Sequence, residues 1–151
     1  MALTTATTLG ALLLARVASH GPAPAMRWDR DDPHWGRIDY QTLAQRVASL
    51  VAAVPATRGE RVAWLGFNHP GQVALLFALA RRGALLVPLN HRLAPADWAA
   101  VVADCTPAML VHDQAFAEPA RALAAATGMQ ALAIDDVPLH VQATTPDTSQ
   151  P

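Results

Sequence analysis

A regular alternation of short apolar runs and helical segments dominates the second half of the chain. Four apolar runs begin at Val62, Leu85, Met109 and Ala131, so that their starts lie 22 to 24 residues apart. One strand, one helix and two turns fit that spacing, which is typical of repeated βα units. Because a βα unit returns the chain to a parallel strand, the spacing predicts a parallel sheet with right-handed crossovers.

Proline and glycine mark the ends of the predicted helices. Pro70 and Pro95 stand at first helical positions, where a missing N–H costs nothing. Gly83 and Gly128 follow two helices as left-handed caps. The helix over 70–82 is apolar nearly all round, so we expect it to be deeply buried. The predicted strands cover 61–66, 84–89, 108–113 and 131–135, and the predicted helices cover 70–82, 95–104 and about 116 or 119 to 127.

The first sixty residues predict helices and a hairpin. A helix over 4–19 is followed by short strands at 25–28 and 37–38, with 29–36 as the turn between them. Asp39 suits an N-cap for the helix over 40–54. That helix has a buried stripe, and we expect its opposite face to be solvated. The buried stripe comprises Leu43, Val47, Leu50, Val51 and Val54, and the solvated face comprises Thr42, Gln45, Arg46 and Ser49.

The fold class that follows is α/β: a parallel sheet of repeated βα units flanked by helices, preceded by a helix and a short β-hairpin. The 151 residues suit one domain. The chain is 52% hydrophobic and 15% charged, whereas charged residues make up about a quarter of an ordinary soluble domain. We therefore expect either a large core or an apolar surface that belongs against a partner.

Charge and cysteine content exclude several functional classes. The net charge is −1 and no block of basic residues occurs, so nucleic-acid binding is not expected. Cys105 is the single cysteine and cannot form an internal disulfide, which favours a reducing cytoplasm. The apolar stretch over 71–89 is interrupted by Arg81, Arg82 and Pro88, so no membrane span is expected.

Polar side chains follow three of the predicted strands. Asn68 and His69 follow the first strand, and Asn90, His91 and Arg92 follow the second. His112 and Asp113 end the third. In a parallel sheet these ends share one edge, where ligands bind. Asn and His also serve as turn and cap residues, so ligand contact, domain docking and local turn chemistry all remain open.

The sequence predicts no catalytic, cofactor-binding or metal-binding residue. His69, His91 and His112 lie on separate loops without helical ligand spacing, so no metal site is expected. Gly66 and Gly71 have the spacing of a phosphate loop, but Gln and Val follow in place of Lys and Ser/Thr. Neither G-x-G-x-x-G nor G-x-S-x-G occurs. The four tryptophans are interpreted as packing residues.

Several short motifs follow one another in the order of a known enzyme family. The chain carries GERVA before the first strand, NHP after it, and GA followed by VPLNHRL around the second strand. A later strand ends in HD, and IDYQTL precedes the helix over 40–54. This series resembles the N-terminal region of the AMP-forming acyl-CoA synthetases, the adenylate-forming AMP-dependent synthetases and ligases that include fatty-acid and coumarate CoA ligases and luciferase. It covers roughly Leu9 to Ile134, with VPLNHRL its most specific part.

Three positions depart from the family's pattern. Asp39 stands where Thr is usual, Thr42 where Glu is usual, and Ala94 where Thr usually caps a helix. Asp39 can still cap, whereas Ala94 cannot, at a cost of about 1 kcal/mol.

The resemblance implies an activity that this sequence does not complete. The family adenylates a carboxylic acid with ATP and Mg²⁺, releases pyrophosphate, and transfers the acyl group to CoA. Its Ser/Thr-Gly-rich phosphate loop ending in Pro-Lys-Gly, its Tyr-Gly-x-Thr-Glu motif, its ribose-binding Asp and its C-terminal domain with a catalytic Lys have no counterpart here. We therefore expect an N-terminal piece of such an enzyme, inactive alone because nothing in it stabilises charge on the α-phosphate.

The resemblance also implies an organisation and a setting. Residues 1–143 would form the N-terminal part of an AMP-binding domain, and 144–151 a disordered tail. The expected partner is the remainder of the enzyme or a covering subunit, and the expected setting is cytoplasmic fatty-acid metabolism. Within a complete enzyme, five strand-end residues would scaffold one side of the acyl pocket: Asn68, His69, Asn90, His91 and Arg92.

Two other hypotheses remain open. The chain could be a stand-alone α/β binding or interaction module derived from the same fold, with its apolar surface covered in a dimer. It could also be half of a split enzyme completed by a second polypeptide. A tight oligomer with a cooperative melt would favour the module, and aggregation with ANS binding would favour the piece of a larger enzyme.

Overall fold

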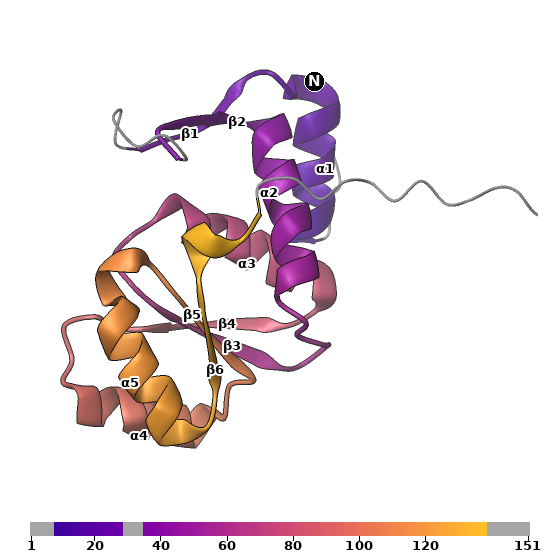
Figure 1. Cartoon of the computed structure of the whole chain (residues 1–151). Coiled ribbons are helices and arrows are strands. Elements are labelled where there is room, and N and C mark those ends of the chain that lie inside the picture. Colours follow the sequence, from indigo (N-terminus) through magenta and orange to yellow (C-terminus); the bar gives the residue numbers. More distant parts are fainter. Residues whose placement is uncertain (1–7, 29–34, 139–151) are drawn as a thin grey trace, which may run out of the picture.

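The computed structural model describes residues 8–28 and 35–138, which contain a two-stranded and a four-stranded sheet (Figure 1). The helices of this part are α1 (Leu9–His20), α2 (Tyr40–Ala53), α3 (Pro70–Arg82), α4 (Pro95–Cys105) and α5 (Ala117–Thr127), with short 3₁₀ turns η1 (Gln114–Phe116) and η2 (Ile134–Asp136). The strands are β1 (Pro24–Arg27), β2 (Arg37–Asp39), β3 (Arg61–Leu65), β4 (Leu85–Leu89), β5 (Met109–His112) and β6 (Gln130–Ala133). The predicted α/β class is confirmed.

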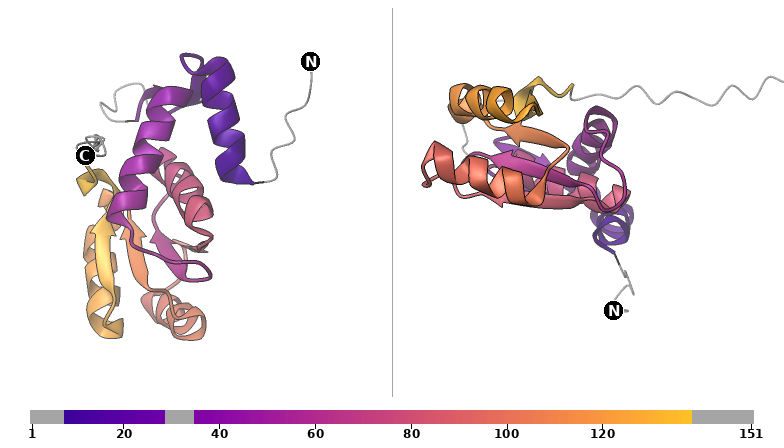
Figure 2. Two further views of the ribbon diagram at one scale, coloured as in Figure 1. Left: turned by 90° about the vertical axis from the view of Figure 1, so that its right-hand side faces the viewer. Right: turned by 90° about the horizontal axis from the view of Figure 1, so that it is seen from below.

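The larger sheet is parallel throughout, with the strand order β4-β3-β5-β6. The chain runs from β3 outward to β4 and then returns past β3 to β5 and β6. Right-handed crossovers therefore place α3 on one face and both α4 and α5 on the other. Figure 1 shows α4 and α5 together at the lower left, and Figure 2 shows α1 and α2 on the opposite side of the molecule. The order reverses between β3 and β5, the point where open α/β sheets bind ligands.

Alternating side chains of β3 build two cores. Val62 and Trp64 face the helices α2 and α3, whereas Ala63 and Leu65 face α4 and α5. All four are at most 1% exposed. Helices thus cover both faces of the central strands, as the continuous apolar runs predict.

The predicted caps are confirmed. The Asp39 carboxylate accepts a hydrogen bond from the Thr42 N–H at 2.7 Å at the start of α2. Gly83 and Gly128 end α3 and α5 in the left-handed conformation, with φ of +70° and +74°. Ala94 gives α4 no side-chain cap, although the Asp97 carboxylate accepts from the Ala94 N–H at 3.3 Å. Thr8 caps α1, so the described helix starts at Leu9, and residues 4–7 of its predicted span lie outside the described residues.

The prediction of a solvated polar face on α2 is wrong for two of its residues. Arg46 and Ser49 are 7% and 3% exposed. Trp35 and η2 pack over this part of the helix, and the Arg46 guanidinium lies 4.0 Å from the centroid of the Trp35 ring. The tryptophan Nε1–H donates to Asp135 Oδ1 at 3.0 Å, which ties the hairpin region to the end of the sheet. A helical wheel of α2 could not predict that Arg46 and Ser49 are buried, because η2, which packs over this face, lies far from α2 in the sequence.

The prediction of a deeply buried α3 is also wrong for part of the helix. Ala74, Leu75, Ala78 and Leu79 are at most 1% exposed, but Leu76 is 39% exposed. The edge strand β4 is similarly open, with Leu85 49% exposed. Within the described residues, no other element packs over one side of α3 or over part of β4. Apolar side chains such as Leu76 and Leu85 therefore lie at the surface.

Three features of the predicted organisation fall wholly or partly on residues that the structure does not describe. The boundary at 143, the tail over 144–151 and part of the predicted turn over 29–36 lie outside the described residues. Within residues 8–28 and 35–138, no helix is long and apolar enough to cross a membrane.

Candidate functional site

The carboxyl ends of β3, β4 and β5 form one edge of the sheet, which we call the strand-end face. The parallel register aligns Leu65 with both Leu89 and His112, so the segments that follow these residues lie side by side. Asn68 and His69, then Asn90, His91 and Arg92, and finally Asp113 all stand on these segments. The structure therefore brings the predicted residues to a common edge, where His69 and His91 each join an aromatic cluster.

The first cluster surrounds His69 with three tryptophans. The imidazole stacks on Trp64 with ring centroids 6.2 Å apart, and meets Trp35 and Trp28 edge-on at 5.3 and 6.0 Å. His69 Nδ1 also accepts a hydrogen bond from the Gly71 N–H at 3.0 Å, which caps α3. His69 thus fixes the start of α3, while Trp28, 40% exposed, forms the solvent side of the cluster.

The second cluster is built from Phe67, His91 and Phe116, which come from three different segments. Phe67 packs edge-on against His91 and against Phe116, with centroids 5.0 Å apart in both cases. The ring of Trp98 extends the cluster inward toward the core, 6.5 Å from Phe116. Phe67 is 51% exposed, so this cluster presents aromatic surface to the outside of the face.

A buried carboxylate holds the turn between the two clusters. Asp113 is 5% exposed, and its Oδ2 accepts from the Phe67 N–H at 2.6 Å. A Cβ at Gly66 would lie 2.5 Å from that oxygen and 2.8 Å from Trp64 Cζ2, so a larger residue would displace the carboxylate. Asp113, the second residue of the predicted polar pair at the end of β5, therefore has a structural partner in the turn after β3.

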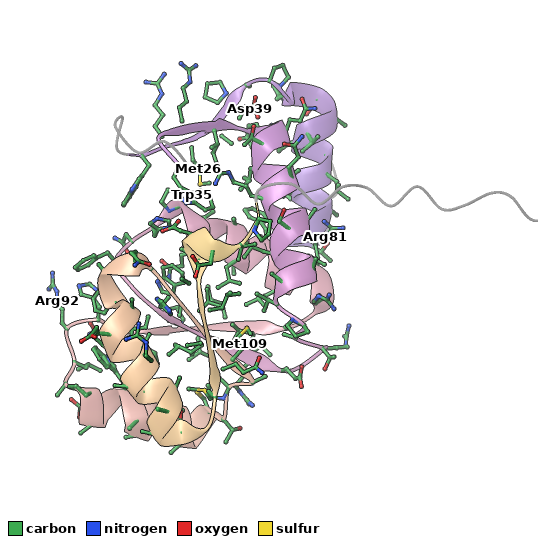
Figure 3. All side chains as sticks on the ribbon, in the orientation of Figure 1. Met26, Trp35, Asp39, Arg81, Arg92 and Met109 are labelled. Atoms are coloured by element: carbon green, nitrogen blue, oxygen red, sulfur yellow. The ribbon has the colours of Figure 1, made fainter. Side chains whose placement is uncertain are left out.

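Local turn chemistry accounts for Asn90. Its Oδ1 accepts from the Arg92 N–H at 3.0 Å, and its backbone carbonyl accepts from Trp98 Nε1–H at 2.8 Å. Asn68 and Arg92 are exposed, and Figure 3 shows Arg92 projecting outward from the left edge of the molecule. In the same view Trp35 points inward beneath the hairpin.

A groove of about 340 Å³ lies beside the His69 cluster. Arg27 and Trp28 of the hairpin region form one wall, and Asn68, Pro70 and Gln72 form the other. Its lining mixes an indole, a guanidinium and two amides, which suits a partly polar partner or ligand. A much smaller cavity, of about 20 Å³, lies between α2 and η2.

Within residues 8–28 and 35–138, the groups present do not fit the ATP, Mg²⁺ and CoA that the resemblance implies. The described residues bring together no three His, Cys, Asp or Glu side chains able to hold a metal ion. The 151-residue sequence contains no lysine, and so lacks the phosphate-binding and catalytic lysines of such enzymes. The strand-end face offers aromatic rings, imidazoles and one buried carboxylate, a set suited to packing and hydrogen bonding.

Sequence reasoning missed Phe67 and Phe116 as members of this face. Phe67 is an apolar residue in a turn otherwise made of Gly and polar residues, and that mismatch is the signal that could have identified it. Phe116 had no comparable signal, because it lies beside a helix start. The interpretation of tryptophans as packing residues holds for Trp35, Trp64 and Trp98, which are at most 5% exposed.

Known proteins resemble this chain over most of its length. A sequence comparison matches residues 13–150 to the family described as AMP-binding enzyme. Feruloyl-CoA synthases of Amycolatopsis sp and Streptomyces sp are each 41% identical over 91 residues, which is 58% of this chain and 18% of theirs. Indoleacetate–CoA ligase of Aromatoleum aromaticum is 43% identical over 74 residues, 49% of this chain and 14% of that enzyme.

The fold is shared with a solved relative. A long-chain-fatty-acid CoA ligase of Rhodopseudomonas palustris superposes with a TM-score of 0.77 at 21% identity, covering 93% of this chain and 38% of the ligase. The chain thus spans well under half the length of the relatives that it matches. With the family match extending over 13–150, this chain belongs to the AMP-binding enzymes and corresponds to the N-terminal part of their larger members.

Proposed function

We propose that this chain supplies the N-terminal part of an ATP-dependent, AMP-forming acid–CoA ligase. The observation that carries the proposal is the family match over residues 13–150. The remaining catalytic groups would come from further polypeptide, in the same chain or in a second one. Because Cys105 is the single cysteine, we place this activity in a reducing cytoplasm.

We propose an aromatic carboxylic acid as the substrate class, in place of the fatty acid expected from the broader family. The relatives with the highest identity above are named for feruloyl and indoleacetate groups, both aromatic. The exposed ring of Phe67, supported by His91 and Phe116, offers an aromatic surface at the strand ends. Edge-to-face aromatic pairs add about 0.5–1.5 kcal/mol beyond simple burial, so this surface favours a planar acyl group.

The role that we propose for the strand-end residues is to brace one side of the acyl pocket. His69 would do so by fixing the start of α3, and Asn90 by closing the turn that carries Arg92. His91 would do so through its ring contact with Phe67. Asn68 stands exposed beside the groove at Trp28. None of these residues takes part in bond making in this proposal.

The first test is ATP–pyrophosphate exchange with the isolated chain, using ferulate, indoleacetate and a long-chain fatty acid. We expect no exchange above a blank without protein, because the sequence contains neither a lysine nor a Ser/Thr-Gly-rich phosphate loop to stabilise charge on the α-phosphate. Exchange that depends on the acid would contradict the proposal.

A chimera tests the proposal positively. Residues 9–138 of this chain would replace the matching part of a feruloyl-CoA synthase, and we expect ferulate-dependent exchange to be retained. Substituting Phe67→Ala should raise the KM for the acid, whereas Asp104→Asn, exposed near the end of α4, should leave it unchanged. A chimera that folds but takes fatty acids in preference to aromatic acids would exclude the aromatic substrate class.

The alternative of a stand-alone binding module has one observation in its favour. Leu9, Leu12 and Leu14 of α1 are 42%, 40% and 59% exposed, an apolar surface that a dimer could cover. Light scattering, thermal melting and ANS fluorescence distinguish these two hypotheses. A stable dimer with a cooperative melt favours the module, whereas a monomer that binds ANS favours the part of a ligase.

A further inference from the structure

Helix α1 lies at the edge of the molecule although its sequence is apolar on nearly every side. Arg16, Ser19 and His20 are the only polar side chains among its 12 residues. Figure 2 shows α1 on the outside of the molecule, away from α4 and α5. A helix that is apolar all round is normally enclosed by other protein or by lipid. Within the described residues α1 is covered on one side only, where Leu13 is buried against α2 and α3.

The exposed leucines of α1 stand on both flanks of this buried contact. Leu12 and Leu14 precede and follow Leu13, so at about 3.6 residues per turn they point about 100° to either side of it. Leu12 and Leu14 are 40% and 59% exposed, and Leu9 is 42% exposed. The outer surface between the two flanks carries Ala11, Ala15 and Ala18. The helix thus presents a convex apolar ridge, and a partner helix packed along one flank would leave the other flank uncovered.

The charged groups at this ridge are basic. Neither α1 nor α3 contains Asp or Glu. Arg16 belongs to α1, and Arg81 of α3 lies beside it, where a Cβ placed on Gly10 would be 3.1 Å from Arg81 Cγ (Figure 3). Both arginines are exposed, and within the described residues neither guanidinium has a hydrogen-bond or ion-pair partner. Two unpaired cations therefore flank an exposed apolar helix.

The shape and the charge of the ridge select its occupant. A second copy that packed α1 against α1 would bring the arginines of both copies together, and like charges across an interface are strongly unfavourable. An anionic lipid bilayer has acyl chains that surround both flanks of a helix and negative headgroups that attract guanidinium groups. A membrane surface therefore suits the ridge better than a second copy or a single partner helix.

We propose that α1 lies in the interface of an anionic lipid bilayer, parallel to its surface. Leu12 and Leu14 enter the acyl region, and Arg16 and Arg81 stay at the level of the headgroups. The 12 residues of α1 extend about 18 Å, which is too short to cross a hydrocarbon core of about 30 Å, so the contact is peripheral. This membrane contact is independent of the proposed ligase function, because it uses none of the strand-end residues.

The test is flotation of the full chain with lipid vesicles through a density gradient, in which aggregated protein does not float. Vesicles of equal parts phosphatidylglycerol and phosphatidylcholine are compared with vesicles of phosphatidylcholine alone at low salt. We expect binding to the anionic vesicles to be at least about tenfold stronger, and added sodium chloride to weaken it. Absence of flotation with the anionic vesicles, or equal binding to both kinds, would overturn the proposal.

A pair of double variants locates the contact on α1. Leu12→Ser with Leu14→Ser should lower binding to the anionic vesicles at least about tenfold. The matched control is Leu93→Ser with Val101→Ser, which changes two exposed apolar residues next to and on α4 and should leave binding unchanged. Circular dichroism and the melting temperature verify that both variants are folded. Equal binding by the two double variants would exclude α1 as the membrane contact.

The arginines are tested one at a time. Arg16→Gln and Arg81→Gln should each lower binding to the anionic vesicles about fivefold, whereas Arg121→Gln on α5 should not change it. Light scattering without lipid tests the competing occupant. A wild-type dimer that Leu12→Ser with Leu14→Ser converts to a monomer would show that a second copy covers α1, and would overturn the membrane contact.

Discussion

At the scale of one residue, Asp39 shows how a single side chain defines where a helix begins. Its carboxylate accepts the Thr42 N–H at 2.7 Å, and this hydrogen bond lowers the pKa of Asp39 below its ordinary value of 3.8. We expect Asp39→Ala to lower the free energy of unfolding by about 1 kcal/mol. Urea titration at neutral pH measures this loss.

The pH dependence of the same cap follows from the direction of the shift. Because the folded pKa of Asp39 is lower than the unfolded one, its contribution is complete above pH 3.8 and is lost as the pH falls through the folded value. Asp39→Asn, whose amide oxygen can still cap, is the control and should lose this pH dependence. A difference between wild type and Asp39→Asn that persists unchanged below pH 3 would contradict this account.

At the scale of an element, α3 has one buried face and one open face despite its largely apolar sequence. Leu75 is fully buried, whereas its neighbour Leu76 is 39% exposed. We expect Leu75→Ala to cost about 2–5 kcal/mol, because it leaves a cavity in the core. Leu76→Ala should stay within about 0.5 kcal/mol of wild type. Thermal and urea unfolding of the two variants provide the comparison, and equal losses would mean that both sides of α3 are covered.

At the scale of the whole molecule, Trp35 and Asp135 join segments that are 100 residues apart. Removing this hydrogen bond should cost about 1 kcal/mol, because the acceptor Asp135 is exposed and water can replace the lost indole donor. We expect Trp35→Phe and Asp135→Ala each to destabilise the fold. The loss in the double variant should be smaller than the sum of the two single losses, as measured by a double-mutant cycle in urea.

Asp135→Asn is the matched control for this tie, because its amide oxygen still accepts from the indole. It should retain most of the wild-type stability. Additive losses in the double-mutant cycle would show that the Trp35–Asp135 contact contributes nothing of its own.

Local patterns predicted most of the fold because they act over a few residues. The apolar runs around Val62, Leu85 and Met109 repeat at the spacing of βα units, and Pro70, Gly83 and Gly128 stand where helices begin and end. Parallel pairing then requires the segments after β3, β4 and β5 to share an edge. Both the architecture and the location of the strand-end face could therefore be predicted without coordinates.

The sequence alone determined the secondary structure, the α/β class and the edge at which the polar residues gather. Tertiary packing decided that Arg46 and Ser49 are buried, that Leu76 is open, and that Phe67 meets Phe116. The physical reason is the range of the interactions. Capping and periodicity depend on neighbours within one or two turns, whereas burial depends on which distant segment packs against a side chain, and residues such as Trp35 and Asp135 meet only once the chain has folded.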